Sequence, residues 1–168
     1  MLRQMQASPL ILLLLLAVMM VPMIPATFAE PPRLDWAAWI AEMDQALERG
    51  DARAAQEAWR EAYVAAHVSH AWPGMLAVGD AAMRASGLVD AQISKAHARR
   101  AYRTALLRAR RQRSLDGVLA AGDAFGRLGD REVVKQALAV ATELAERSGD
   151  GAARQRVQLF QTQWAPRT

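Results

Sequence analysis

Hydrophobic and polar positions follow a helical period along most of the chain. From Glu30 to Thr168 apolar residues recur three and four positions apart, and no run alternates apolar and polar residues as a strand would. Alanine, leucine, arginine, glutamate and glutamine dominate this part, and all of them favour helices. The pattern predicts helices near residues 34–49, 52–69, 73–85, 89–112, 115–128, 131–148 and 151–163.

The breaks between these helices carry turn and capping residues. They are Gly50-Asp51, Ser86-Gly87, Gly129-Asp130, Gly149-Asp150 and the turn around Pro73. Glycine just past a helix end accepts the left-handed conformation that closes the helix, and aspartate then caps the next one. Proline suits the first turn of a new helix. We therefore expect consecutive helices to be joined by short connections.

Segments of the chain repeat one another. The segment 74–84 (GMLAVGDAAMR) returns as 117–127 (GVLAAGDAFGR), with seven of eleven positions identical. Arg60–Ala66 is echoed by Arg99–Ala105, and RGDARAAQEA resembles LGDREVVKQA further along. Helix pairs that recur at such a period indicate a solenoid.

The echoes predict an all-α solenoid of αα-hairpins. Its units are 34–69, 72–112 and 115–148, and the helix at 151–163 caps the open end, because a terminal unit must hide its apolar face.

The third unit resembles a tetratricopeptide repeat. The residues that match the family's pattern are Val118, Ala121, Gly122, Phe125, Leu128, Gly129, Asp130, Val134, Leu138 and Ala141. The first unit departs from it at Glu42 and Met43, where the family has small residues, and the second has Ala82 in place of the aromatic residue. The resemblance implies a scaffold that binds a protein or peptide in a groove lined by the first helices, with no catalytic residues.

The first thirty residues have the layout of a secretory signal peptide. Arg3 precedes the apolar core Leu10–Val21, two prolines follow, and small residues at Thr27 and Ala29 suit a peptidase. We expect cleavage after Ala29 and a periplasmic or secreted protein. In the alternative, the segment 10–28 stays as a membrane anchor.

The expected division is therefore a signal peptide at 1–29 and one helical repeat domain at 30–168. The mature length suits a single domain. The absence of cysteine from the sequence excludes disulfides, thiolate zinc sites and thiol nucleophiles.

One predicted helix is strongly basic. Between Asp90 and Asp116 there are eight basic residues and no acidic one, whereas Glu30–Asp90 carries a net charge of −5. The basic residues are Lys95, Arg99, Arg100, Arg103, Arg108, Arg110, Arg111 and Arg113. At helical spacing one face of this helix is an apolar stripe of Ala98, Ala101, Tyr102, Ala105, Leu106 and Ala109, and the opposite face carries Arg99, Arg100, Arg103, Arg110 and Arg111. This cationic face could dock an acidic partner or anionic lipid, or it could be a solvated face neutralised by the acidic first unit or by a second copy. We expect no nucleic-acid partner after export.

Candidate partner-binding residues fall into two groups. Asp80, Arg84, Asp123 and Arg127 recur at equivalent positions and would line the groove, and Arg99, Arg103 and Arg110 represent the basic helix. Trp36 and Trp72 lie near helix ends and would either line the groove or join Trp39 and Trp59 in the core.

Catalytic and metal-binding motifs do not stand out. The sequence has no G-x-S-x-G, H-E-x-x-H or phosphate-binding glycine loop. His67 and His70 have the spacing of a metal pair, but no carboxylate lies beside them in sequence, and histidine near a helix C-terminus is also favoured by the helix dipole. We expect no catalytic residues, metal site or cofactor.

The favoured function is an exported, non-enzymatic scaffold that binds a protein or peptide. One alternative is an envelope-peripheral assembly component whose basic helix binds anionic lipid or polymer. Another is an accessory subunit of an envelope enzyme. The sequence leaves the oligomeric state and the identity of the partner open.

Overall fold

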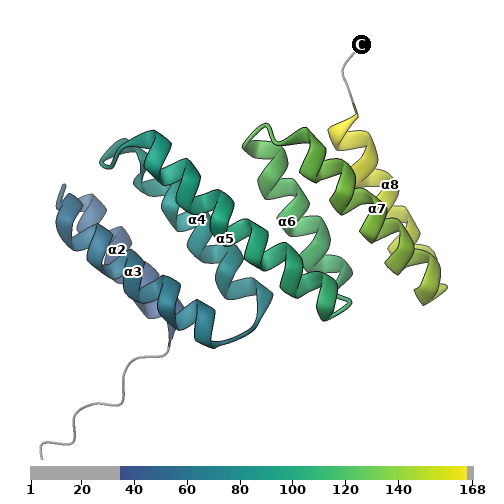
Figure 1. Cartoon of the computed structure of the whole chain (residues 1–168), viewed down its shortest axis with the longest axis horizontal. Helices are drawn as coiled ribbons and strands as arrows, with labels where there is room; N and C mark the ends of the chain where they lie inside the picture. Colours follow the sequence, from purple (N-terminus) through teal and green to yellow (C-terminus); the bar gives the residue numbers. More distant parts are fainter. Residues whose placement is uncertain (1–34, 166–168) are drawn as a thin grey trace, which may run out of the picture. The chain divides into compact units, whose positions relative to one another are not determined.

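The chain is all-helical in the residues that the structure, a computed structural model, describes, which are 35–165 (Figure 1). In chain order the helices are α2 (Trp36–Glu48), α3 (Ala52–Val68), α4 (Trp72–Arg84), α5 (Ala91–Arg111), α6 (Leu115–Arg127), α7 (Arg131–Ser148) and α8 (Gly151–Trp164). All seven helices predicted from the sequence are confirmed, with ends that differ by two residues at most. The predicted signal peptide lies outside the described residues.

Most of the predicted helix ends have the expected chemistry. Gly50, Gly129 and Gly149 adopt positive φ angles of 72°, 83° and 69°. Asp51 and Asp150 cap α3 and α8 through their side chains, which accept hydrogen bonds from backbone N–H groups. The break at Ser86-Gly87 differs: it forms a short 3-10 turn, η1 (Ala85–Gly87), rather than a left-handed cap.

The helices pack as sequential pairs. The most extensive contacts join α2 to α3, α4 to α5 and α6 to α7, and α8 packs on α7 and α6. Beyond these pairs α2 contacts α4, α4 contacts α6, and α6 contacts α8, so these four helices form one layer. The helices α3, α5 and α7 form the other layer, which faces the viewer in Figure 1.

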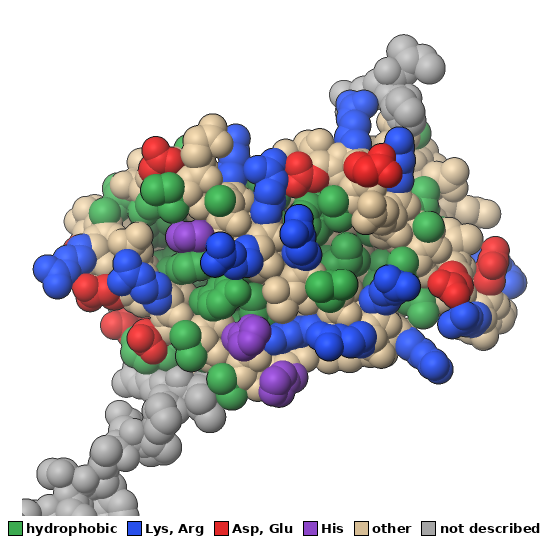
Figure 2. Space-filling view, in the orientation of Figure 1, with side chains coloured by type: hydrophobic (Ala, Val, Ile, Leu, Met, Phe, Trp, Pro, Cys, Tyr) green, Lys and Arg blue, Asp and Glu red, His purple; other side chains and the backbone are tan. Residues whose placement is uncertain are grey.

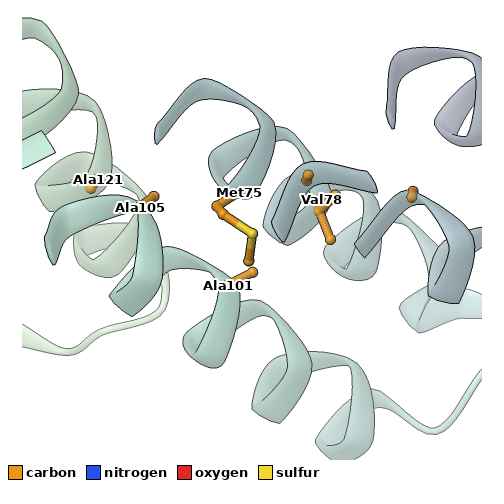
Figure 3. Close-up of a cluster of buried hydrophobic side chains, with 7 residues drawn as sticks. Met75, Val78, Ala101, Ala105 and Ala121 are labelled. Atoms are coloured by element: carbon orange, nitrogen blue, oxygen red, sulfur yellow. The ribbon is translucent and has the colours of Figure 1, made fainter. Parts of the chain in front are cut away.

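Alanine dominates the core, because small side chains let helices approach closely. Ala62, Ala101 and Ala105 are fully buried and surround the larger Met75 and Val78 of α4. Figure 3 shows the Met75 side chain extending from α4 toward Ala101 of α5.

Aromatic rings fill the space that glycines leave open. A Cβ added to Gly79 would lie 2.3 Å from Cε1 of the buried Tyr102, so α4 and α5 can touch here only without a side chain. The Tyr102 ring meets Phe125 of α6 edge to face, with centroids 5.9 Å apart. These contacts join neighbouring helix pairs into one core.

Candidate interaction surfaces

Ion pairs link the helices of the α2, α4, α6 and α8 layer in series. Arg84 of α4 donates two hydrogen bonds to the Asp44 carboxylate of α2, at 3.1 and 2.9 Å. Arg127 of α6 donates to Asp80 of α4 at 3.2 Å. Arg156 of α8 pairs with Asp116 of α6. Each pair joins two helices that lie next to each other in this layer.

Asp80 and Asp123 each bind more than one donor. The Tyr102 hydroxyl donates to the Asp80 carboxylate at 2.8 Å, and burial together with this bond raises the pKa of Tyr102. Asp123 accepts from Arg127 on its own helix and from Gln163 of α8, the latter at 2.7 Å. Both carboxylates therefore hold neighbouring helices together.

All four groove candidates lie on this layer. Asp80 and Arg84 stand on α4, Asp123 and Arg127 on α6, and each is hydrogen-bonded to another residue of the fold. Their side chains remain partly exposed, from 29% for Asp123 to 55% for Arg127. A partner that binds here would meet alternating charges that are already paired.

The α5 helix presents a basic surface on the opposite layer. Figure 2 shows Lys and Arg side chains spread over the middle of this face. Arg103 and Arg110 are exposed, and neither forms an ion pair within residues 35–165. The other exposed arginines of this helix region without such a pair are Arg100, Arg111 and Arg113.

Arg99 differs from the other two candidates on α5. Its guanidinium donates two hydrogen bonds to the Asp130 carboxylate, at 2.7 and 3.0 Å, and this contact raises the pKa of Arg99. Asp130 precedes α7 at the N-cap position, but its side chain does not cap the helix. The carboxylate is instead bound to α5, so Arg99 is part of the packing between α5 and α7.

Arg108 is a basic residue of α5 that does not belong to the exposed basic surface. Only 4% of this residue is accessible. Its guanidinium donates to the carbonyl oxygens of Ala66, His67 and Ala71, at 2.9, 2.8 and 3.1 Å. Two of these carbonyls belong to the last turn of α3, which has no further helical partner for them. Arg108 therefore caps α3 from inside the fold.

The spacing of buried residues on α5 was a signal for this role. Ala98, Ala101, Ala105 and Ala109 are buried at helical spacing, and Arg108 falls on the same stripe. A basic residue on an alanine stripe must reach either solvent or buried acceptors, and here it reaches acceptors.

Trp36 and Trp72 pack between helix pairs rather than into a groove. A Cβ on Gly74 would lie 3.0 Å from Nε1 of Trp36, and one on Gly117 would lie 2.8 Å from the Trp72 ring. Each indole thus covers a glycine at the start of the following pair, which supports the core interpretation.

The histidines contact arginine and aromatic side chains. Nδ1 of His67 lies 3.5 Å from Nη2 of Arg108. The His97 ring stacks on Trp59 with centroids 4.5 Å apart, and burial, helped by Arg100 and Arg60, lowers its pKa. Within residues 35–165 no three His, Cys, Asp or Glu side chains are grouped so that they could hold a metal ion.

Helices long and apolar enough to cross a membrane are absent from the part of the chain that the structure describes. The expected anchor at 10–28 lies outside that part. Comparisons with protein-family models, with curated proteins and with solved structures give no match to this chain.

Proposed function

We propose that this chain is an exported, non-enzymatic scaffold of tetratricopeptide-like hairpins that binds a protein or peptide partner. The starts of α2, α4, α6 and α8 support the repeat, because they fall at residues 36, 72, 115 and 151, at spacings of 36, 43 and 36 residues. The longer middle unit contains η1 and the 21-residue α5, whereas α3 and α7 have 17 and 18 residues.

The observation that carries the proposal is a packing contact that recurs between successive units. Gly74 of α4 meets Trp36 and Ala66 of the hairpin before it, and Gly117 of α6 meets Trp72 and Ala109 of the hairpin before it. Each glycine packs on the first-helix tryptophan and the second-helix alanine before it. Units that stack in this way build an extended surface from their first helices, as repeat scaffolds do.

The proposed binding surface is the layer of α2, α4, α6 and α8. Its ion pairs alternate acid and base along three helix-to-helix steps, which suits recognition of an extended polar segment. Electrostatic complementarity of this kind sets specificity more than it sets affinity. Replacing one residue of an ion pair would also destabilise the fold, so the test must keep each ion pair intact.

A charge swap tests this surface. In the variant Asp44→Arg/Arg84→Asp the pair is retained with reversed polarity. We expect crosslinking of the exported chain in its native envelope to lose its partner in this variant. The matched control is Arg53→Glu/Glu57→Arg, which reverses an exposed pair on α3 and should keep the partner. Equal crosslinking in both variants would contradict the proposed surface.

Export of the chain is tested by a separate measurement. Mass spectrometry of the native chain should find an N-terminus at Glu30 in the extracytoplasmic fraction. A chain that retains Met1–Ala29 in the cytosol would contradict this part of the proposal.

A second candidate function rests on the exposed arginines of α5, which lack carboxylate partners within residues 35–165. This surface would bind an anionic lipid surface or an envelope polymer. We expect vesicles with anionic lipid to bind the chain at low salt and to lose it as salt rises. Arg103→Glu/Arg110→Glu should abolish this binding. Arg99 is a poor choice for the test, because replacing it breaks the contact with Asp130.

An accessory role beside an envelope enzyme is the third candidate, and it follows from the same binding surface. Crosslinking that recovers a catalytic subunit, lost in the Asp44→Arg/Arg84→Asp variant, would support it.

A further inference from the structure

A hollow of about 650 Å³ opens between α7 and α8, near the C-terminal end of α8. Val134 and Leu138 of α7 and Phe160 and Trp164 of α8 form its apolar lining. Arg131 and Lys135 add positive charge from the first turns of α7. The hollow is therefore apolar inside and basic along one side.

The same groove occurs earlier in the chain, between α3 and α4. Its lining includes Ala55, Gln56, Trp59, Ala82 and Ala85. The residues 79 positions later are Val134, Lys135, Leu138, Gln161 and Trp164, and all five line the hollow between α7 and α8. An offset of 79 residues also separates the start of α4 from that of α8, at residues 72 and 151. The two grooves are thus equivalent positions in the chain.

A helix occupies the earlier groove. Ser94 and His97 of α5 lie against its lining, and the His97 ring stacks on Trp59. Only about 20 Å³ of space remains there. The described residues include no helix after α8, so within residues 35–165 no element takes the place in the later groove that α5 takes in the earlier one.

The indole N–H of Trp164 has no hydrogen-bond partner among the described residues. Its Nε1 is buried and has no acceptor in the described part of the chain. By contrast, Nε1 of Trp59 in the earlier groove donates to the Val78 carbonyl at 3.0 Å. Buried donors are almost always paired, so this unpaired N–H distinguishes the later groove from the earlier one.

We propose that the hollow between α7 and α8 binds an amphipathic helix of a partner protein, with an apolar stripe and acidic residues along one flank. This inference rests on the proposed scaffold function and names the kind of partner. The helical form follows from the way α5 fills the equivalent groove. The acidic flank follows from Arg131, which forms no ion pair within residues 35–165, and from Lys135, which has only a 3.4 Å contact with Glu132.

The groove is tested with designed peptides of about 20 residues, long enough for a helix of about 30 Å. The first carries leucine and alanine at helical spacing and glutamate on its flank. The second has lysine in place of glutamate, and the third has the composition of the first in scrambled order. The readout is the indole N–H resonance of Trp164 in the exported chain, assigned with Trp164→Phe. We expect the first peptide to shift this resonance and to bind about tenfold more tightly than either of the others.

Charge reversal at the rim provides the second arm. Arg131→Glu/Lys135→Glu should weaken the acidic peptide about tenfold and favour the lysine peptide instead. The matched control, Lys95→Glu/Arg154→Glu, changes two exposed charges outside the groove and should leave binding as it was.

Three outcomes would overturn the inference. The Trp164 resonance could stay unchanged, or the scrambled peptide could shift it equally. The chain could also form a dimer that the Arg131→Glu/Lys135→Glu variant disrupts, which would make a second copy the occupant. The scaffold proposal fails separately, if the Asp44→Arg/Arg84→Asp variant keeps the native partner.

Discussion

The guanidinium of Arg108 donates from Nη2 to the carbonyl oxygen of His67 at 2.8 Å, across 41 residues of sequence. This bond joins the last turn of α5, the basic helix, to the end of α3. It places a positive charge at the C-terminus of a helix, where the helix dipole is negative. The Arg108 cation on α5, the second helix of one hairpin, therefore stabilises the C-terminus of α3, the second helix of the hairpin before it.

Replacing Arg108 should destabilise the fold. Arg108→Met keeps much of the apolar stem but removes three hydrogen bonds from a charged donor; the Ala66 and His67 carbonyls keep the Ser69 hydroxyl and the His70 N–H as donors, whereas the Ala71 carbonyl loses Arg108. We expect the free energy of unfolding to fall by about 2–3 kcal/mol, because a hydrogen bond to a charged group contributes about 1.5–3 kcal/mol and two of the three acceptors keep another donor. Urea denaturation followed by circular dichroism measures this change.

The neighbouring Arg111 provides the control, since it is exposed on the same helix. Arg111→Met should change the free energy of unfolding by less than about 0.5 kcal/mol. If both variants were equally stable, the capping role of Arg108 would be refuted.

Gly79→Ala should also destabilise the fold, although alanine is the better helix former. The added Cβ would lie 2.3 Å from the Tyr102 ring, which is buried and cannot move aside freely. Overpacking of this kind costs about 1–3 kcal/mol, which outweighs the gain in helix propensity of about 1 kcal/mol. Thermal unfolding of Gly79→Ala and Gly87→Ala gives the comparison. A Cβ at Gly87 meets nothing within 4 Å, so that variant should unfold at or above the wild-type temperature.

Tyr102→Phe isolates one hydrogen bond in the layer of first helices. The change removes the hydroxyl that donates to Asp80 at 2.8 Å but keeps the ring against Gly79 and Phe125. We expect a loss of about 1–2 kcal/mol in the free energy of unfolding, the usual range for a bond to a partly solvated carboxylate. Tyr63→Phe is the control, because the Tyr63 hydroxyl forms no hydrogen bond within residues 35–165. An equal loss in both variants would show that the bond to Asp80 contributes nothing.

The His97 ring makes stability depend on pH. Burial and the nearby Arg100 and Arg60 lower its pKa in the folded chain below the ordinary 6.5. The unfolded chain therefore binds the proton more readily than the folded chain. The contribution of His97 to the free energy of unfolding is fully present above pH 6.5 and decreases as the pH falls below it. Thermal unfolding between pH 7.5 and 5 should show this decline in the wild type and a flatter profile in His97→Gln.

His70→Gln tests whether the pH effect belongs to His97. His70 is exposed in the middle of the α3–α4 connection, so its replacement should keep the wild-type decline. If His97→Gln retained the full decline, another group would have to be its source.

Local rules were enough for the helices and their ends. Glycine followed by aspartate predicts the boundaries at residues 50, 129 and 149, because the left-handed cap and the N-cap act over only a few residues, although the Asp130 side chain binds Arg99 instead of capping α7. The exception at Gly87 lies in the longer connection to α5, where a 3-10 turn continues α4. The alanine stripe of α5 was predicted for the same local reason, since its period is helical.

The partners of the charged residues were not accessible in this way. The spacing separates Arg108, on the alanine stripe, from Arg99 and Arg103, but it does not tell that Arg99 binds Asp130, that Arg103 is exposed and that Arg108 caps α3. The difference depends on which carbonyls and carboxylates another helix brings within 3 Å, and those acceptors lie about 30 to 40 residues away. A pattern among neighbouring residues does not predict contacts between helices that far apart in the chain.

The sequence by itself determined the seven helices between residues 36 and 164, their ends to within two residues, and the apolar stripe of α5, because all three depend on neighbours within a few positions. Only the tertiary structure decided which charged side chains hold helices together, and that within residues 35–165 no helix fills the groove between α7 and α8 as α5 fills its earlier equivalent. The physical reason is that ion pairs and grooves are made by side chains from different helices, whose relative placement is set by packing of the whole core.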